Sequence, residues 1–445
     1  MDKIDHLRES ILASQTFCFY PFTQLSSNPS GHLKPCCNYV DPLKNKEGKI
    51  LSIMNGDGFI DAWNSEEMVN IRQQLYKGRI PNSCMRCIRD NNVSMRTRSI
   101  HEYKNNRKVL ELVNDSIDNN YFIESLPSYL ELKPSNLCNL KCVMCNSYDS
   151  SQISKELNEL SQKFGGIKIQ DGRFIEISST PGITENNHTW YSFESPDWSD
   201  NQKVWNDFEK IAPSLETLSF AGGEPTIIPF VLKTLHYLVE NNFSKNITIF
   251  LSSNFTNLNK NFLNLMPKFK KFELIASIDG FEKINDYARY PSKWVQVSKN
   301  YIEAKKYMSY GNIKILNNIT VSALNVVNLD SLLYFLEDHA KEYPYFAEYP
   351  YNINLIMFPK EQQISMLPNS MKEIASTRLI RYLEKSRILK DFPSMVENIN
   401  LLLNELKKPD SPNLFQQFKN RIKILDEHRG ITIGDYIPEL KDLFK

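Results

Sequence analysis

The chain has no long apolar run, and this absence limits the classes of protein to which it can belong. None of its 445 residues lies in an apolar stretch near the roughly 20 residues that a membrane-spanning helix needs. The first ten residues, MDKIDHLRES, also contain no apolar segment of the kind found in signal peptides. These absences predict a soluble protein of the cytoplasm with no membrane partner.

The chain also has almost no excess of charge. It carries 53 Lys and Arg against 52 Asp and Glu, which leaves a net charge of +1. A nucleic-acid-binding surface would require a strong basic excess, so no nucleic-acid partner is indicated. The length predicts two or three domains.

Eight cysteines are present, and three of them are closely spaced in the run CNLKCVMC: Cys138, Cys142 and Cys145. Three thiolates leave one iron of a four-iron cluster without a protein ligand, so that iron can bind a further molecule. A structural zinc site is the alternative, but it needs a fourth ligand, and none of the seven histidines lies near this run. Disulfides are disfavoured because the cysteines cluster as metal ligands do.

The cysteine run lies between an alternating segment that begins at Ser128 and predicts a strand, and a helical segment that begins near Ser151. A loop at the carboxyl end of a strand is where α/β proteins place their chemistry. At these residues the chain resembles the radical S-adenosylmethionine (SAM) superfamily. The resemblance implies an enzyme in which the three cysteines hold the catalytic four-iron cluster and its open iron binds SAM.

Strand-like and helical segments alternate through the middle of the chain, which predicts an α/β fold with a parallel sheet. Six strands fit the partial (β/α)6, TIM-like barrel that the resemblance implies. They are predicted at 128–133, 215–220, 246–253, 271–277, 313–322 and 352–358. Three domains are predicted. They are an N-terminal iron–sulfur domain (1–120), the barrel (121–360) with a possible lid insertion (165–199), and a C-terminal helical extension (361–445).

The second predicted strand ends in the sequence GGEP, with Gly222, Gly223 and Glu224. Two glycines allow a ligand to approach the backbone, and the carboxylate can accept a hydrogen bond from an amine. A simple turn is the alternative explanation. The resemblance implies that GGEP contacts the amino group of SAM.

Polar residues after the next strands complete the implied SAM site, although turns, helix caps and a surface salt bridge are alternatives for them. The resemblance implies a cofactor-binding set of Met144, Ser252, Asn254, Ser277, Asp279 and Arg289, with Leu324 and Asn325 near the adenine. Arg289 is included because a guanidinium suits the SAM carboxylate.

A second group of cysteines precedes residue 100. Cys18, Cys36, Cys84 and Cys87 can close a four-ligand site, for which zinc and a four-iron cluster are both possible. Their spacing, with Gly31 and with a helix that carries Trp63 and Arg72, resembles the Twitch module, the shorter relative of the SPASM domain. That resemblance implies an auxiliary four-iron cluster, here placed before the barrel.

Cys37 is left over once these ligands are assigned. It is either a small buried residue beside the cluster or a thiol that donates a hydrogen atom.

The resemblance implies the activity as well. A radical SAM enzyme cleaves SAM reductively to a 5'-deoxyadenosyl radical, which abstracts a hydrogen atom from the substrate. An auxiliary cluster favours a net oxidation, either a dehydrogenation or a cross-link, of a small molecule or peptide. The alternatives are a redox-neutral epimerase or isomerase that uses Cys37, and a non-enzymatic iron–sulfur or zinc protein. The implied electron donor is a flavodoxin or ferredoxin.

Overall fold

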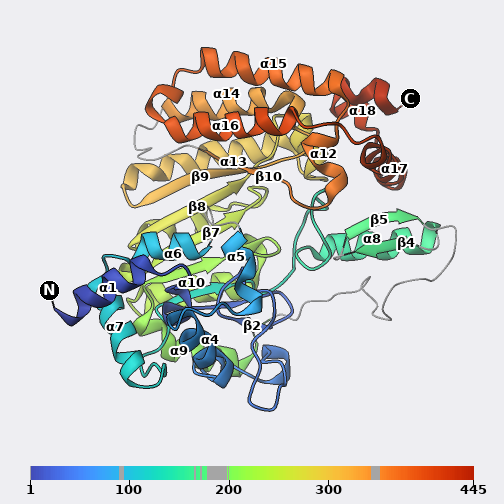
Figure 1. The fold of residues 1–445 in the computed structure, drawn as a ribbon. Coiled ribbons are helices and arrows are strands. Elements are labelled where there is room, and N and C mark those ends of the chain that lie inside the picture. The colour runs from blue at the N-terminus through green and yellow to red at the C-terminus, as the bar shows by residue number, and fades with distance from the viewer. Residues whose placement is uncertain are drawn as a thin grey trace.

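A computed structural model describes residues 2–89, 95–164, 167–170, 173–177, 198, 200–341 and 351–444. An eight-stranded sheet runs through its centre in the order β10-β9-β8-β7-β6-β3-β1-β2 (Figure 1). The six predicted strands are all present, adjacent in chain order and parallel: β3 (Tyr129–Leu132), β6 (Thr217–Phe220), β7 (Thr248–Ser253), β8 (Lys271–Ser277), β9 (Ile313–Val321) and β10 (Tyr351–Leu355). These parallel strands, connected by helices, confirm the predicted α/β fold class, and among the described residues no pairing between β10 and β2 closes the sheet.

Helices connect the strands and cover the sheet. In chain order the helices are α1 (Lys3–Ala13), α2 (Tyr20–Thr23), α3 (Phe59–Trp63), α4 (Glu66–Tyr76), α5 (Met85–Arg89), α6 (Met95–Tyr103), α7 (Arg107–Asp118), α8 (Ser151–Phe164), α9 (Gln202–Ile211), α10 (Pro229–Glu240), α11 (Lys260–Leu263), α12 (Lys283–Ala288), α13 (Trp294–Lys306), α14 (Leu329–Lys341), α15 (Asn369–Lys385), α16 (Pro393–Leu406), α17 (Pro412–Arg429) and α18 (Ile433–Tyr436).

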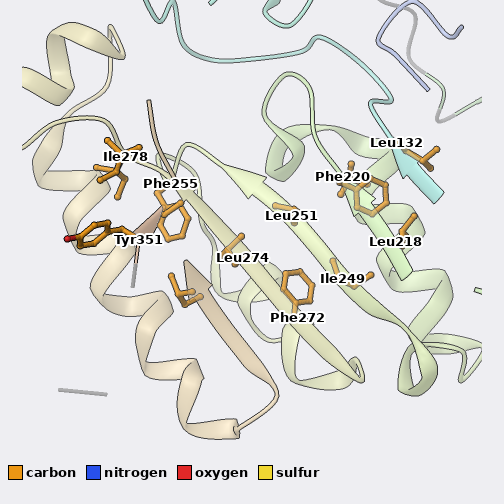
Figure 2. Packing of buried hydrophobic residues seen from close by; sticks show 14 of the residues in the cluster. Leu132, Leu218, Phe220, Ile249, Leu251, Phe255, Phe272, Leu274, Ile278 and Tyr351 are labelled. Carbon is orange, nitrogen blue, oxygen red and sulfur yellow. The ribbon is translucent and has the colours of Figure 1, made fainter. Parts of the chain in front are cut away.

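The core forms because one face of each strand is apolar. In register across four strands, Leu130 lies beside Leu218, then Ile249, then Phe272, and all four are fully buried. A second row two residues further along contains Leu132, Phe220, Leu251 and Leu274 (Figure 2). Both rows belong to one core shared with the helices, which fixes the register of the strands.

The opposite face of the sheet is polar. Glu131 lies in register with Ser219, Phe250, Glu273 and Lys314. Since successive side chains of a strand point to opposite faces, this row faces away from the core described above. The carboxyl ends of the same strands carry the cysteine loop and the other motifs, so the sheet places them at one edge.

The N-terminal region joins the same sheet. The strand β1 (Gln24–Ser27) pairs in parallel with β3 and antiparallel with β2 (Leu33–Lys34). Gly31 lies in the turn between β1 and β2 with φ +77°, and a Cβ there would lie 3.3 Å from Ile53 Cβ. The turn therefore favours glycine, which gives a structural reason for the spacing noted in the sequence.

Arg72 of α4 ties the N-terminal region together. Its side chain is fully buried, and its guanidinium lies 4.5 Å from the ring centre of Trp63. It donates to the carbonyl groups of Pro21, Trp63 and Tyr121 at 2.7, 2.7 and 3.1 Å, and to Asn64 Oδ1 at 2.8 Å. Arg72 thus joins α2, α3 and the segment before β3.

Two further parts of the chain lie outside the sheet. Most of the predicted lid insertion, including Trp190 and Tyr191, lies outside the described residues. Within its described part, β4 (Ile167–Gln170) and β5 (Arg173–Ile177) pair in an antiparallel hairpin. Trp198 is also described and is buried against Phe59 and Phe230. The C-terminal helices α15, α16 and α17 lie within the range 361–445, for which a helical extension was predicted. Among the described residues, no helix is long and apolar enough to cross a membrane.

Candidate functional site

The three central cysteines lie on the loop that follows β3, as predicted. Cys138 and Cys142 are each 8% exposed, and Cys145 is partly buried. The loop is ordered by its own hydrogen bonds: the amide of Leu140 donates to Cys138 Sγ at 3.5 Å, and the amide of Cys138 donates to Ser151 Oγ at the start of α8. The thiols are free and share one small apolar cluster with Leu140.

Burial holds these thiols in the neutral form. It raises the pKa of Cys138 to about 12 and also raises the pKa values of Cys142 and Cys145. A nearby carboxylate raises the pKa of Cys142 further, and the other cysteines of the loop raise that of Cys145 further. Within the described ranges, no group of three or more His, Cys, Asp or Glu side chains is arranged so that it could hold a single metal ion. A four-iron cluster is much larger than one ion and separates its thiolates, so three free, electrostatically coupled thiols on one loop fit its donor set.

The GGEP sequence after β6 contacts the cysteine loop directly. The amide of Glu224 donates to Leu137 O at 2.8 Å, and the amide of Gly223 donates to Asp149 O at 3.1 Å. Gly222 and Gly223 have φ of +77° and +56°, and a Cβ on Gly223 would collide with Leu137 O. Both glycines are thus needed for this close approach of two backbones.

Glu224 is buried, and its carboxylate is fully engaged within the chain. Oε1 accepts from Thr226 Oγ1 at 2.6 Å and Ser253 Oγ at 2.8 Å, and Oε2 accepts from the amide of Asn254 at 2.7 Å. Burial raises its pKa, although these hydrogen bonds lower it in part. Glu224 therefore holds the ends of β6 and β7 together, and contact with an amine would require it to exchange one of these bonds.

The end of β7 also reaches the cysteine loop. Asn254 Nδ2 donates to Asn139 Oδ1 at 2.9 Å, which places Asn254 at the site, as the sequence suggested. Ser253, which donates to Glu224, was not among the predicted site residues, and Ser252 remains a prediction. The alternation of buried Ile249 and Leu251 with less buried neighbours places Ser253 on the core side and Ser252 on the other, and this signal was available in the sequence.

The segment after β8 forms a second polar group beside the loop. Asp279 is fully buried, accepts from Arg289 Nε at 2.7 Å and from the Thr320 amide at 2.7 Å, and its carbonyl accepts from Asn325 Nδ2 at 2.6 Å. Burial opposes the charged form of Arg289, but Asp279 and, to a smaller extent, Cys142 outweigh it and raise the pKa of Arg289. Ser277 ends β8 and is partly buried.

Two residues expected near the adenine have different surroundings. Met144 is partly buried and packs against the cluster of cysteines. Leu324 is 1% exposed and belongs to the main core. The structure thus brings Met144, but not the Leu324 side chain, to the cysteine loop.

The N-terminal cysteines form a second group. All four predicted ligands are free thiols, and they lie close enough to affect one another's pKa. Cys18 and Cys84 raise the pKa of Cys36, and Cys87 raises the pKa values of Cys18 and Cys84. Burial raises the pKa of Cys18 to about 11 and that of Cys84 to about 12. Four neighbouring cysteines fit the donor set of a closed cluster.

Cys37 has different neighbours from Cys36. Burial raises its pKa to about 12, and the next largest effect comes from Glu131 of β3, with Lys133 and Lys34 acting in the opposite direction. Glu131 belongs to the polar row of the sheet. Cys37 therefore lies at the junction between the N-terminal cysteines and the polar face of the sheet.

Comparison with known proteins assigns the N-terminal region. Residues 18–88 match the family model for SPASM, an iron–sulfur cluster-binding domain. This match confirms the resemblance to the SPASM group and the predicted iron–sulfur module, and the matched range contains Cys18, Cys36, Cys84 and Cys87. No curated protein sequence matches the chain.

Several solved structures have a distant similarity. Native anSMEcpe with bound AdoMet is 14% identical with a TM-score of 0.36, over 60% of this chain and 63% of that one. Streptococcus suis SuiB bound to S-adenosylmethionine is 15% identical with a TM-score of 0.32, over 73% and 61%. SuiB bound to its precursor peptide SuiA is 14% identical with a TM-score of 0.32, over 83% and 70%. The chain thus spans less than two thirds of the first two proteins.

Proposed function

We propose that this chain is a radical SAM enzyme whose catalytic cluster is held by Cys138, Cys142 and Cys145. The proposal depends chiefly on one observation: loops that are far apart in the sequence meet at the cysteine loop. GGEP donates two backbone hydrogen bonds to residues on either side of the cysteines, and the segment that carries Arg289 accepts two from within them. The carboxyl ends of neighbouring parallel strands thus form one site.

Each part of the site has a role toward the cofactors. When bound, a reduced four-iron cluster and SAM supply a 5'-deoxyadenosyl radical that abstracts a hydrogen atom from the substrate. Gly222 and Gly223 bring the backbone close to the SAM position, and Arg289 presents its terminal NH2 groups to a carboxylate while Asp279 holds its Nε. Met144 and the buried loop exclude water from the thiolates.

We propose a net oxidation of a small molecule or peptide as the overall reaction. The four N-terminal thiols would hold an auxiliary cluster, which would provide an acceptor for the electron left on the substrate, and a flavodoxin or ferredoxin would supply the electron for SAM cleavage. A second candidate is a redox-neutral epimerisation or isomerisation. It is favoured by one observation, namely that Cys37 faces Glu131 and the polar side of the sheet, where a thiol could reach a substrate.

Metal analysis under anoxic conditions tests the proposal. The reconstituted protein should hold about eight irons and eight sulfides per chain, and Cys84→Ala with Cys87→Ala should lower this to about four. That double variant should still cleave SAM under dithionite and should form no oxidised product. Cys142→Ala should abolish SAM cleavage and keep the auxiliary cluster.

Cys37→Ala is the matched control because it removes a thiol that is assigned to neither cluster. It should keep about eight irons and full oxidation activity. If it uncouples 5'-deoxyadenosine formation from product, epimerisation is the better assignment. Bound zinc with no SAM cleavage would overturn the enzymatic proposal in favour of a metal-binding protein.

A further inference from the structure

The backbone on both sides of Cys142 is fastened at every hydrogen-bonding group. The amides of Lys141 and Val143 donate to Tyr290 O at 2.5 Å and Ala288 O at 2.9 Å. Their carbonyl groups are used by another part of the chain. Lys141 and Val143, the residues on either side of Cys142, are thus hydrogen-bonded to two different parts of the chain.

The second side is the C-terminal helix α17. Lys141 O accepts from Arg429 Nη2 at 2.8 Å, and Val143 O accepts from Arg421 Nη2 at 3.1 Å. Gln362 Nε2 also donates to Val143 O, at 3.0 Å. The two arginine contacts join residues 288 and 278 positions apart in the sequence, and Figure 1 shows α17 next to α8 and the β4–β5 hairpin.

Both arginines are buried and held by carboxylates. Arg429 donates to both oxygens of Glu156, at 2.8 and 2.7 Å, with side-chain exposures of 2% and 3%. Arg421 pairs with Glu361 at 3.0 Å, with exposures of 5% and 6%. The two-point contact with Glu156 fixes the plane of the Arg429 guanidinium, and the contact with Glu361 holds Arg421, so that Nη2 of each arginine points at a loop carbonyl.

One face of α17 delivers both groups. Arg421 and Arg429 are eight residues apart, a spacing that returns to nearly the same side of a helix, and the buried Leu425 lies between them. Both arginines line a small pocket together with Cys142 and Cys145. The helix therefore forms the wall of the cysteine site.

We propose that Arg421 and Arg429 are positioning residues for the three-cysteine loop, so that the C-terminal helix is part of the central iron site. The proposal rests on the proposed function for what the loop binds, but the contacts themselves do not depend on a metal. Since the arginines act on backbone carbonyls, their effect reaches the iron through the geometry of Cys142.

Hydrogen–deuterium exchange in the metal-free full chain tests the contact. Arg429→Gln and Arg421→Gln should each speed exchange at the amides of Lys141 and Val143 by roughly tenfold to a hundredfold, because a hydrogen bond to a charged group is lost. Lys423→Gln is the matched control: it removes a positive charge from an exposed position of α17 and should leave both amides unchanged.

A second measurement separates positioning from loss of fold. In the iron-loaded Arg429→Gln protein, the change that SAM causes in the electron paramagnetic resonance spectrum of the reduced central cluster should be lost or altered. The signal of the auxiliary cluster should stay as in the wild type. Arg429→Lys keeps the charge but cannot bridge Glu156 and Lys141 O in the same way, so it should restore the wild-type spectrum only in part.

The outcomes distinguish the two proposals. Unchanged exchange at Lys141 and Val143 in both glutamine variants overturns the positioning role, even if the wild type holds eight irons. If the wild type takes up no iron but the glutamine variants still exchange faster, the positioning contact is supported and only the enzymatic proposal is overturned. Loss of the auxiliary signal together with the central one shows general unfolding and overturns a specific role for Arg429.

Discussion

Arg289 and Asp279 form a buried ion pair next to the cysteine loop. Nε of the arginine donates to Oδ2 of the aspartate over 2.7 Å, and the two side chains are 13% and 0% exposed. The remaining carboxylate oxygen of Asp279 accepts from the Thr320 amide. The pair therefore links the end of β8 to β9 and fixes the orientation of the Arg289 guanidinium beside the cysteine loop.

Removing one partner of this pair should be strongly destabilising. Asp279→Ala leaves the Arg289 cation buried without its carboxylate, which should cost about 3–5 kcal/mol in the free energy of unfolding, measured by urea denaturation of the metal-free protein. The double variant Asp279→Ala with Arg289→Met should recover part of this loss because no charge remains buried. Glu303→Gln, which breaks the exposed pair with Lys306, is the control and should leave the stability close to that of the wild type.

Gly223→Ala should damage the contact between GGEP and the cysteine loop. The new methyl group meets Leu137 O, and the residue is held at φ +56°, so we expect a loss of about 3 kcal/mol or more in unfolding free energy. Gly311→Ala is a matched control, since Gly311 has φ +81° with no atom within 4 Å of its added Cβ. It should cost only the backbone strain, about 1–2 kcal/mol. Equal losses in urea denaturation would contradict the steric argument.

Arg72→Met should destabilise the N-terminal iron–sulfur module. The substitution removes four donors and leaves the carbonyls of Pro21, Trp63 and Tyr121 to find other partners, which should cost about 3–5 kcal/mol. Arg72→Lys should be nearly as damaging, because one ammonium group cannot reach all four acceptors. The auxiliary iron content of the reconstituted protein provides a second measurement. Wild-type stability in Arg72→Lys would show that charge alone suffices.

The parts of the fold that repeat along the chain could be predicted from the sequence. The six predicted strands overlap β3, β6, β7, β8, β9 and β10, and the helix predicted to begin near Ser151 is α8, because their apolar residues recur at strand or helix spacing. The strand β1 could not be predicted because QLSS is short and polar, and only its pairing with β3 makes it a strand. The strand β2 could not be predicted either, because it has only two residues.

The candidate site divides in a similar way. Motifs that lie in loops after strands, such as GGEP and Asn254, were found because their residue types are unusual for a core. Arg421 and Arg429 were not, because two arginines on an amphipathic helix normally indicate a solvated face. Their role depends on Glu156 and Glu361, which neutralise them in the interior, and this pairing across the chain leaves no local pattern.

Cys18 should make the stability of the metal-free protein depend on pH. Burial raises the pKa of its thiol from 9.0 to about 11, so between these values the folded state keeps a proton that the unfolded state has lost. The stabilisation is fully present below pH 9 and is lost as the pH rises through 11, which amounts to about 2–3 kcal/mol. Urea denaturation of reduced protein from pH 8 to 11 should therefore show a steeper decline for the wild type than for Cys18→Ala. Ser298→Ala, at a position without a thiol, should follow the wild type, and parallel curves for wild type and Cys18→Ala would contradict a buried neutral thiol.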